Sequence, residues 1–544
     1  MTEATDTWIL VGPLLIVAFG GLAMMLLDAF AKEKAELAIV TAVILLGAAG
    51  VSLGLWFRGP EVTEPGMIGS YLAYDKLAHF LDLVICGGAA LAALLAGGYL
   101  REHRLERGEF YIILLFASFG AMALGRAVDL LTIFIAVETL SLGVYGLVAF
   151  RRSSPRAAEA ALKYFLLGSF ASAILLFGLA LLYGATGRTS LSEIHDAVAG
   201  GEAATPLLLM SMLLITVGLA FKISAVPFHA WAPDAYEGAV TPASTYMAVV
   251  VKAAVFGVMI RIFLVAFGDP SLANDGAGWP PALMGLAAIT MVVGNLAALG
   301  QKNVKRMLAY SSISHAGFIL LGLVAAYELQ GSEGIPSSVL FYLAAYTVSN
   351  ILAFGSLIAV GSFGKEAVTY EDLAGVGRRH PWLAFPFTLG ILSLMGFPPT
   401  AGFFAKYYVI LAAVEGGGTL LWVAVLAVLS SAVGAYYYLR VLVFLFMKTP
   451  EKDAVVAVPM KSGYVVAVLV IASYFVLRLG VTPDAYLGLV GLTNADGVEL
   501  DWMTFFVDGG IAVVAGALAA GLATMRSGTA GADASPEAEA KAPG

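Results

Sequence analysis

The chain has 544 residues, of which 60% are hydrophobic and only 12% are charged. A soluble domain carries about 25% charged residues, so this composition excludes an ordinary globular protein and predicts a polytopic membrane protein. The formal net charge of -8 argues against nucleic-acid binding. The single cysteine excludes an internal disulfide, a cysteine-held iron–sulfur cluster and a four-cysteine zinc site, so we expect no metal or cofactor in this chain.

Apolar runs follow one another along most of the chain. At roughly 20 residues per crossing they predict about 14–15 transmembrane helices, and none alternates with the period of two that is typical of a barrel strand. We therefore predict an all-α bundle. The expected spans lie near residues 8–28, 36–57, 75–99, 109–125, 129–149, 157–183, 205–228, 241–266, 280–300, 303–325, 336–363, 383–413, 418–447, 463–480 and 503–525.

Basic residues accumulate in every second loop, as they do in cytoplasmic loops. Examples are Arg101 to Arg107 and Arg151 to Arg156, whereas intervening loops such as GDPSLANDGAG are acidic or neutral. This pattern predicts that the N-terminus lies outside and the C-terminus in the cytoplasm. The start MTEATDTW lacks a basic region before its apolar run, so we expect no cleaved signal peptide.

A weak internal repeat predicts the domain organisation. Residues 109–266 and 280–447 align at an offset of five spans, and an odd offset requires two five-helix units in opposite orientations, as in many transporters. The aligned ionisable residues are Glu138 with His315, Lys222 with Lys406, and Lys252 with Arg440. Residues 1–108 and 448–526 are expected to add N- and C-terminal transmembrane helices, and residues 527–544 a disordered cytoplasmic tail.

The segment from residue 213 to residue 256 indicates a hydrated path. It places Lys222 and Lys252 in two apolar runs, and a lysine at the centre of a membrane helix costs about 3 kcal/mol. Prolines free backbone carbonyls that are tolerated only against protein or a water-filled cavity. We expect one helix break at Pro227 and a second at Pro398 and Pro399.

Glu138, Lys163 and Lys222 each have two interpretations. Glu138, far inside an apolar run, is expected to be protonated unless a cation lies near it, and Lys222 is the obvious candidate. Such a pair could exchange a proton, or it could be a static salt bridge. Lys163 could carry protons or could extend toward the basic loop at Arg156.

The remaining candidates lie nearer the breaks or in the second unit. Lys252 lies mid-span, and Lys406 repeats the lysine-by-proline arrangement of Lys222. His229 could cap the broken helix or titrate. His315 follows three serines that could order water, or it could be a satisfied interior histidine, whereas Arg440 is more often an anchor.

Several tracts resemble one family. FKISAVPFHAWAPDAYEGAVTP, VVVKAAVF, GNLAALGQKNVKRMLAYSSISHAGF and LMGFPPTAGFFAKYYV are similar to the antiporter-like membrane subunits of respiratory complex I, NADH-quinone oxidoreductase. The lysine at 252 after PFHAWAPDAYEG is most similar to the subunit N branch, the counterpart of mitochondrial subunit 2. The resemblance covers residues 109–447. Val240 departs from it, because a proline is common there, and the run 503–525 lies beyond the usual fourteen spans.

The resemblance implies proton translocation across the cell (inner) membrane, coupled to electron transfer from NADH to quinone. It matches Glu138 and Lys222 to the family's glutamate–lysine pair, Lys163 and Lys252 to its connecting lysines, and Lys406 to its exit-side lysine. It also implies that NADH, FMN, iron–sulfur clusters and quinone are bound by partner subunits, and that neighbouring membrane subunits and lipids contact this chain. Two alternatives remain: a subunit of a multi-subunit cation/proton antiporter, and a structural membrane anchor, for which five unpaired buried charges would cost on the order of 10 kcal/mol.

Overall fold

The computed structural model describes residues 2–31, 33–58, 66–201, 203, 205–273, 278–330, 336–361, 366–450 and 459–483. In these ranges the regular structure is helical. Three isolated β-bridges occur in the same ranges, but no extended β-strand does. The predicted span 503–525 and the predicted tail 527–544 lie outside the described residues.

Thirteen helical segments among the described residues are long and apolar enough to cross a membrane, which confirms the prediction of a polytopic all-α membrane protein. The helices are α1 (Thr2–Phe30), α2 (Leu37–Arg58), α3 (Gly66–Gly69), α4 (Lys76–Glu102), α5 (Glu109–Arg126), α6 (Leu130–Val148), α7 (Pro155–Thr186), α8 (Leu191–Ala199), α9 (Thr205–Lys222), α10 (Trp231–Gly238), α11 (Thr241–Tyr246), α12 (Lys252–Arg261), α13 (Trp279–Leu299), α14 (Val304–Gln330), α15 (Ser337–Val360), α16 (Val376–Arg379), α17 (Pro381–Met395), α18 (Ala401–Glu415), α19 (Gly418–Phe446) and α20 (Gly463–Val481).

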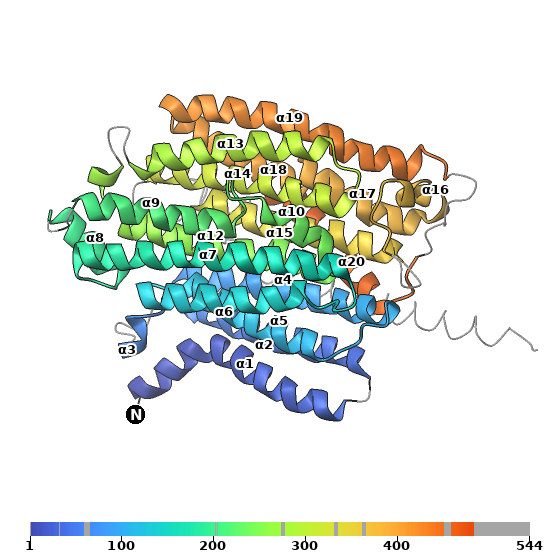
Figure 1. The fold of residues 1–544 in the computed structure, drawn as a ribbon, viewed down its shortest axis with the longest axis horizontal. Helices are drawn as coiled ribbons and strands as arrows, with labels where there is room; N and C mark the ends of the chain where they lie inside the picture. The colour runs from blue at the N-terminus through green and yellow to red at the C-terminus, as the bar shows by residue number, and fades with distance from the viewer. Residues whose placement is uncertain are drawn as a thin grey trace, which may run out of the picture.

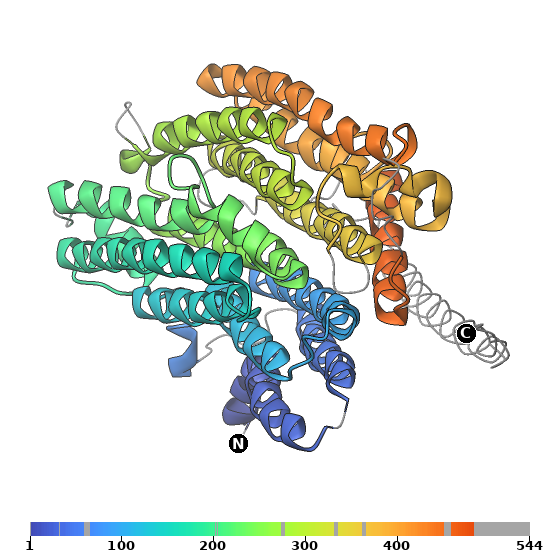
Figure 2. The same ribbon diagram turned by 45° about the vertical axis from the view of Figure 1, so that its right-hand side comes forward.

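The long helices lie side by side, with α1 at one edge of the molecule and α19 at the other (Figure 1). Between them the order is not that of the chain, because α20 packs against α4 and α15 in the middle of the bundle. Turned by 45°, the bundle shows the green and yellow helices between the blue N-terminal and the orange C-terminal ones (Figure 2). The segments 241–266, 304–329 and 337–360 are the most enclosed, each with 94% of its apolar window buried. The interior of the bundle therefore lies where the two predicted units meet.

Both expected helix breaks are present. α9 ends at Lys222 and α10 begins only at Trp231, so Pro227 lies in the interruption. α17 and α18 each have 15 residues, or about 22 Å, which is shorter than the roughly 30 Å hydrocarbon core. They therefore cross together as one span, interrupted at Pro398 and Pro399.

The segment after the first break is not a uniform α-helix. Between α11 and α12, residues Met247–Val251 form a π-helical turn, and Ile262–Ala266 form another after α12. Such turns are rare and occur frequently at functional sites. The first of them immediately precedes Lys252.

The domain boundaries and the inverted relation of the two units remain predictions.

Candidate functional site

Lys222 is the last residue of α9, and its side chain is buried. Its Nζ donates hydrogen bonds to Ser141 Oγ of α6 at 2.7 Å and to Ser172 Oγ of α7 at 3.2 Å. At the break, Trp231 Nε1 donates to the freed Phe221 carbonyl at 3.0 Å. A tryptophan therefore satisfies the free carbonyl at the end of α9, and two serine hydroxyls accept the hydrogen bonds of the lysine.

Glu138 lies on α6, three residues before Ser141, and is half-buried. The expected direct ion pair with Lys222 is not formed among the described residues, because the lysine binds Ser141, one turn further along the helix, instead. The two groups remain close enough for their charges to interact. Glu138 Oε1 is buried without a hydrogen-bond partner in this structure. The pair is thus near but not in direct contact, and Lys222 is bound by the serine one turn beyond Glu138.

Lys163 lies on the outside of this chain, with 47% of its side chain exposed. Its Nζ pairs with Glu159 at 2.6 Å on its own helix and with Asp234 of α10 at 3.0 Å. Arg306 of α14 also pairs with Asp234, at 2.6 Å. Burial alone would raise the pKa of Asp234, but the hydrogen bonds from Arg306 and Lys163 lower it. Asp234 of the broken-helix segment α10 therefore links Lys163 of the first unit to Arg306 of the second. In the described structure Lys163 does not pair with the basic loop at Arg156.

Lys252 is 2% exposed and lies between the two units. Its Nζ donates to the Ser312 carbonyl of α14 and lies 5.5 Å from the centre of the Tyr346 ring. The Tyr346 hydroxyl in turn donates to Ser312 Oγ at 2.8 Å. The only hydrogen-bond acceptor of the Lys252 ammonium among the described residues is thus a carbonyl of the second unit.

His315 is buried one turn beyond Ser312. Its Nδ1 lies 2.6 Å from the Tyr342 hydroxyl, and its Nε2 lies 3.2 Å from the Tyr438 hydroxyl. Lys252 contacts Ser312 and Lys406 lies over the Phe318 ring, so His315 lies between the two lysines along α14. A neutral imidazole has one donor and one acceptor nitrogen, and a tyrosine hydroxyl can take either role. This arrangement can accept a proton at one ring nitrogen and release one from the other.

A cavity of about 10 Å³ adjoins His315 on the side of Lys406. That is about the smallest space that holds one water. Its polar lining consists of His315, Tyr342, Tyr346, Ser349 and Ser393. A single water there could bridge the histidine and the serine hydroxyls.

Lys406 lies on α18, just after the second break. Its Nζ donates to the Met395 carbonyl at 2.8 Å and to Ser431 Oγ at 2.9 Å, and it lies 5.3 Å from the centre of the Phe318 ring. Met395 is the last residue of α17, so the lysine satisfies a carbonyl that the break has freed. The two lysines therefore lie differently at the two breaks. Lys222 is the last residue of α9, whereas Lys406 of α18 donates to the last carbonyl of α17.

His229 and Arg440 take more peripheral places. His229 is half-buried in the first break, and its Nδ1 has no hydrogen-bond partner in the described structure. Arg440 lies over the Tyr370 ring at 4.4 Å, consistent with an anchor. Within the described residues no group of three or more His, Cys, Asp or Glu is placed to hold a metal ion.

A second buried cluster of charged residues was not predicted from the sequence. Arg126 of α5 donates from its Nη2 to Asp82 Oδ2 of α4 at 2.5 Å and to Ser52 Oγ of α2 at 3.3 Å. Nearby, Arg261 makes two 2.8 Å hydrogen bonds to the carboxylate of Asp75. Asp82 in LAHFLDLVIC shows the same signal as Glu138, an ionisable residue in an apolar run, and could have been found in that way. These contacts fasten the N-terminal helices to α5 and α12.

Taken together, the described structure gathers Lys252, His315 and Lys406 into one polar zone along α14, and Glu138 and Lys222 into another. Among the described residues, no hydrogen bond joins His315 directly to either of its two neighbouring lysines. No hydrogen bond in the described part of the chain connects the two zones directly. The chemistry available is proton transfer among amines, an imidazole, a carboxylate and hydroxyls.

Comparison with known proteins gives one consistent result. Residues 127–432 match the family model for NADH:quinone oxidoreductase/Mrp antiporter transmembrane subunits. NADH-quinone oxidoreductase subunit N 1 of Sorangium cellulosum is 52% identical over 498 residues, covering 89% of this chain and 97% of that protein. Subunit N of Trichlorobacter lovleyi is 41% identical over 81% of this chain and 88% of its own length.

Solved structures show the same fold. A chain of respiratory complex I from Thermus thermophilus superposes with a TM-score of 0.73 at 35% identity, covering 88% of this chain and 98% of its own. A chain of the Mrp complex from Dietzia sp. DQ12-45-1b superposes with a TM-score of 0.77 at 22% identity, covering 93% and 99%. At that lower identity the likeness concerns the fold alone.

Proposed function

Because this chain belongs to the family of NADH:quinone oxidoreductase and Mrp antiporter membrane subunits, we propose that it is subunit N of a proton-translocating NADH:quinone oxidoreductase. The 52% identity to a subunit N over nearly its full length supports this assignment over an Mrp-type antiporter subunit, because the solved Mrp chain is 22% identical. The third alternative, a structural anchor, would leave the buried lysines without a purpose.

The observation that carries the proposal is the placement of His315 between Lys252 and Lys406. Each of these side chains is at least nine-tenths buried, and their partners are hydroxyls and carbonyls rather than carboxylates. A static ion pair would place an acidic group beside each lysine, because an uncompensated buried charge is costly. Groups that are held by neutral dipoles can be charged or neutral in turn.

We place the relay in the order Glu138, Lys222, Lys252, His315 and Lys406, with Lys163 and His229 as further candidates. A proton on Lys252 Nζ would pass through water to the Tyr342 or Tyr438 hydroxyl, and from there to the imidazole nitrogen of His315 that this hydroxyl contacts. His315 would release a proton from its other nitrogen toward the small cavity and Lys406. The step from Lys222 to Lys252 requires water or a side-chain movement.

Translocation needs a driving force from elsewhere. Moving one charge against a membrane potential takes about 2.3 kcal/mol per 100 mV, so the relay depends on coupling to electron transfer. In this proposal NADH, FMN, iron–sulfur clusters and quinone are bound by partner subunits, and the neighbours of this chain are other membrane subunits. The N-terminus faces outward and the C-terminus faces the cytoplasm.

The direct test compares Lys222→Ala with Lys448→Ala, an exposed lysine after α19. We expect Lys222→Ala to abolish or strongly reduce NADH-driven proton uptake in inverted vesicles, while Lys448→Ala pumps normally. Both complexes should contain flavin and iron–sulfur partners on purification. Normal pumping by Lys222→Ala in a verified assembled complex would remove the relay from this chain.

A further inference from the structure

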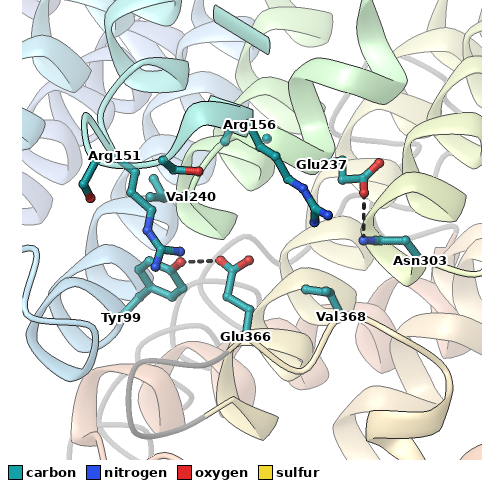
Figure 3. A pocket seen from close by; sticks show the side chains of 12 residues that line it. Tyr99, Arg151, Arg156, Glu237, Val240, Asn303, Glu366 and Val368 are labelled. Carbon is teal, nitrogen blue, oxygen red and sulfur yellow. Dashed lines mark hydrogen bonds between the residues drawn. The ribbon is translucent and has the colours of Figure 1, made fainter. Parts of the chain in front are cut away.

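A cavity of about 320 Å³ opens at the end of the bundle where the basic loops gather. Arg151, Arg156, Glu237, Asn303 and Glu366 contribute its charged and amide side chains (Figure 3). These loops are the ones predicted to face the cytoplasm, so with the orientation given under the proposed function the cavity is expected at the cytoplasmic membrane surface. It belongs to neither of the two polar zones of the proton relay.

The carboxylate of Glu366 is already compensated. It accepts hydrogen bonds from the Tyr99 hydroxyl and from Thr241 Oγ1 at 2.8 Å, and it pairs with Lys305 Nζ at 3.2 Å. Burial alone would raise the pKa of Glu366, but Lys305 and these hydrogen bonds lower it, so the group is held as an anion. It is therefore part of the wall of the cavity and not a vacant acceptor.

Glu237, the other carboxylate, is compensated as well. Arg306 Nη1 pairs with Glu237 Oε2 at 3.1 Å, and Asn303 Nδ2 donates to Oε1 at 3.4 Å (Figure 3). Both acidic groups of the cavity thus have a cation from α14. What remains is the charge of the two arginines.

Arg151 and Arg156 make no side-chain hydrogen bond or ion pair with any described residue, although both line the cavity. They flank the N-terminus of α7, whose first turn is capped by Ser154, and the dipole of this 32-residue helix adds partial positive charge at the same place. The cavity therefore presents two unpaired guanidinium groups and one helix terminus. A guanidinium group matches the paired oxygens of a phosphate and binds it through two parallel hydrogen bonds.

We propose that this cavity binds the phosphate group of an anionic membrane phospholipid. Anionic lipids concentrate in the cytoplasmic leaflet, and basic pockets between transmembrane helices at that surface bind such headgroups. The volume of about 320 Å³ is many times the roughly 10–15 Å³ that one water needs, so the cavity has room for a phosphodiester. From the cavity, α7 continues with the exposed apolar side chains Leu162, Phe165, Leu166 and Phe170, along which acyl chains can lie. A free phosphate ion would use the arginines but not this apolar face.

The test uses membranes that contain the assembled complex, with a photoactivatable phosphatidylglycerol whose reactive group is on the acyl chain near the glycerol. After illumination, the labelled peptides of this chain are identified by mass spectrometry. The variant is Arg151→Gln with Arg156→Gln, and the matched control is Arg152→Gln. Arg152 is adjacent in sequence but lies outside the cavity, where it pairs with Glu109 at 2.8 Å on the exposed surface.

We expect labelling of the first turns of α7 in wild type and in Arg152→Gln, and about tenfold less for each cavity arginine removed. Excess phosphatidylglycerol should compete, whereas phosphatidylcholine and inorganic phosphate should compete weakly. Equal labelling of the double variant and the control would overturn the site. Equally strong competition by inorganic phosphate would overturn the assignment to a lipid. Because labelling is read without NADH, the outcome is independent of whether the chain moves protons.

Discussion

Replacing the two serines that bind Lys222 tests whether this lysine carries protons or only contributes to helix packing. Ser141 and Ser172 supply the two hydrogen-bond acceptors of Lys222 Nζ, at 2.7 and 3.2 Å. Serine to alanine removes a single oxygen and leaves the apolar packing of α6 and α7 almost unchanged. Its main effect therefore falls on the charged form of the lysine.

The magnitude follows from these contacts. A hydrogen bond to a charged group contributes about 1.5–3 kcal/mol, and each 1.36 kcal/mol corresponds to about a factor of ten in a population or a rate. Ser141→Ala should therefore reduce the rate of NADH-driven proton uptake by about 10- to 150-fold if the ammonium form of Lys222 is an obligatory intermediate. Ser172→Ala, with the longer bond, should have a smaller effect.

The control is Ser211→Ala. Ser211 is also a buried serine, on α9 like Lys222, but it donates only to the Leu208 carbonyl at 2.7 Å. The assay measures proton uptake in inverted vesicles together with NADH oxidation, at matched amounts of assembled complex. If Ser141→Ala and Ser172→Ala pump at the rate of Ser211→Ala, protonation of Lys222 does not limit pumping, and the interpretation of this contact as part of the relay is refuted.

Three further predictions concern other charged contacts. Lys252→Arg keeps a permanent charge and should impair proton uptake as much as Lys252→Ala, whereas Lys252→His should be milder; an active Lys252→Arg would mean that the residue supplies charge only. Asp82→Asn leaves Arg126 buried without its counter-ion and should cost about 3–5 kcal/mol of stability, whereas Asp82→Leu with Arg126→Met should restore the wild-type melting temperature in detergent. Burial alone would raise the pKa of Asp75, but Arg261 lowers it to about 2. Since the unfolded carboxyl has a pKa near 4, the contribution of Asp75 to the free energy of unfolding should be full above pH 4 and should disappear as the pH falls toward 2. Asp75→Asn should flatten that part of the pH–stability curve.

The sequence by itself determined the fold class, because apolar runs of spanning length and the costs of proline and lysine in a membrane are local properties of the chain. The breaks at Pro227 and at Pro398 and Pro399 could be predicted for this reason. The candidate lysines could be named in the same way, since an ionisable residue in an apolar run needs no knowledge of its neighbours.

Only the tertiary structure decided which groups meet. Ser141 lies 81 residues from Lys222, and Tyr438 lies 123 residues from His315. A spacing of that length carries no information about contact, so the expectation of a direct Glu138–Lys222 pair could not anticipate that Lys222 binds Ser141 instead. The pairing of Glu366 with Lys305, which among the described residues leaves Arg151 and Arg156 as the unpaired charges of the larger cavity, likewise arises only when loops from both halves of the bundle converge on one surface.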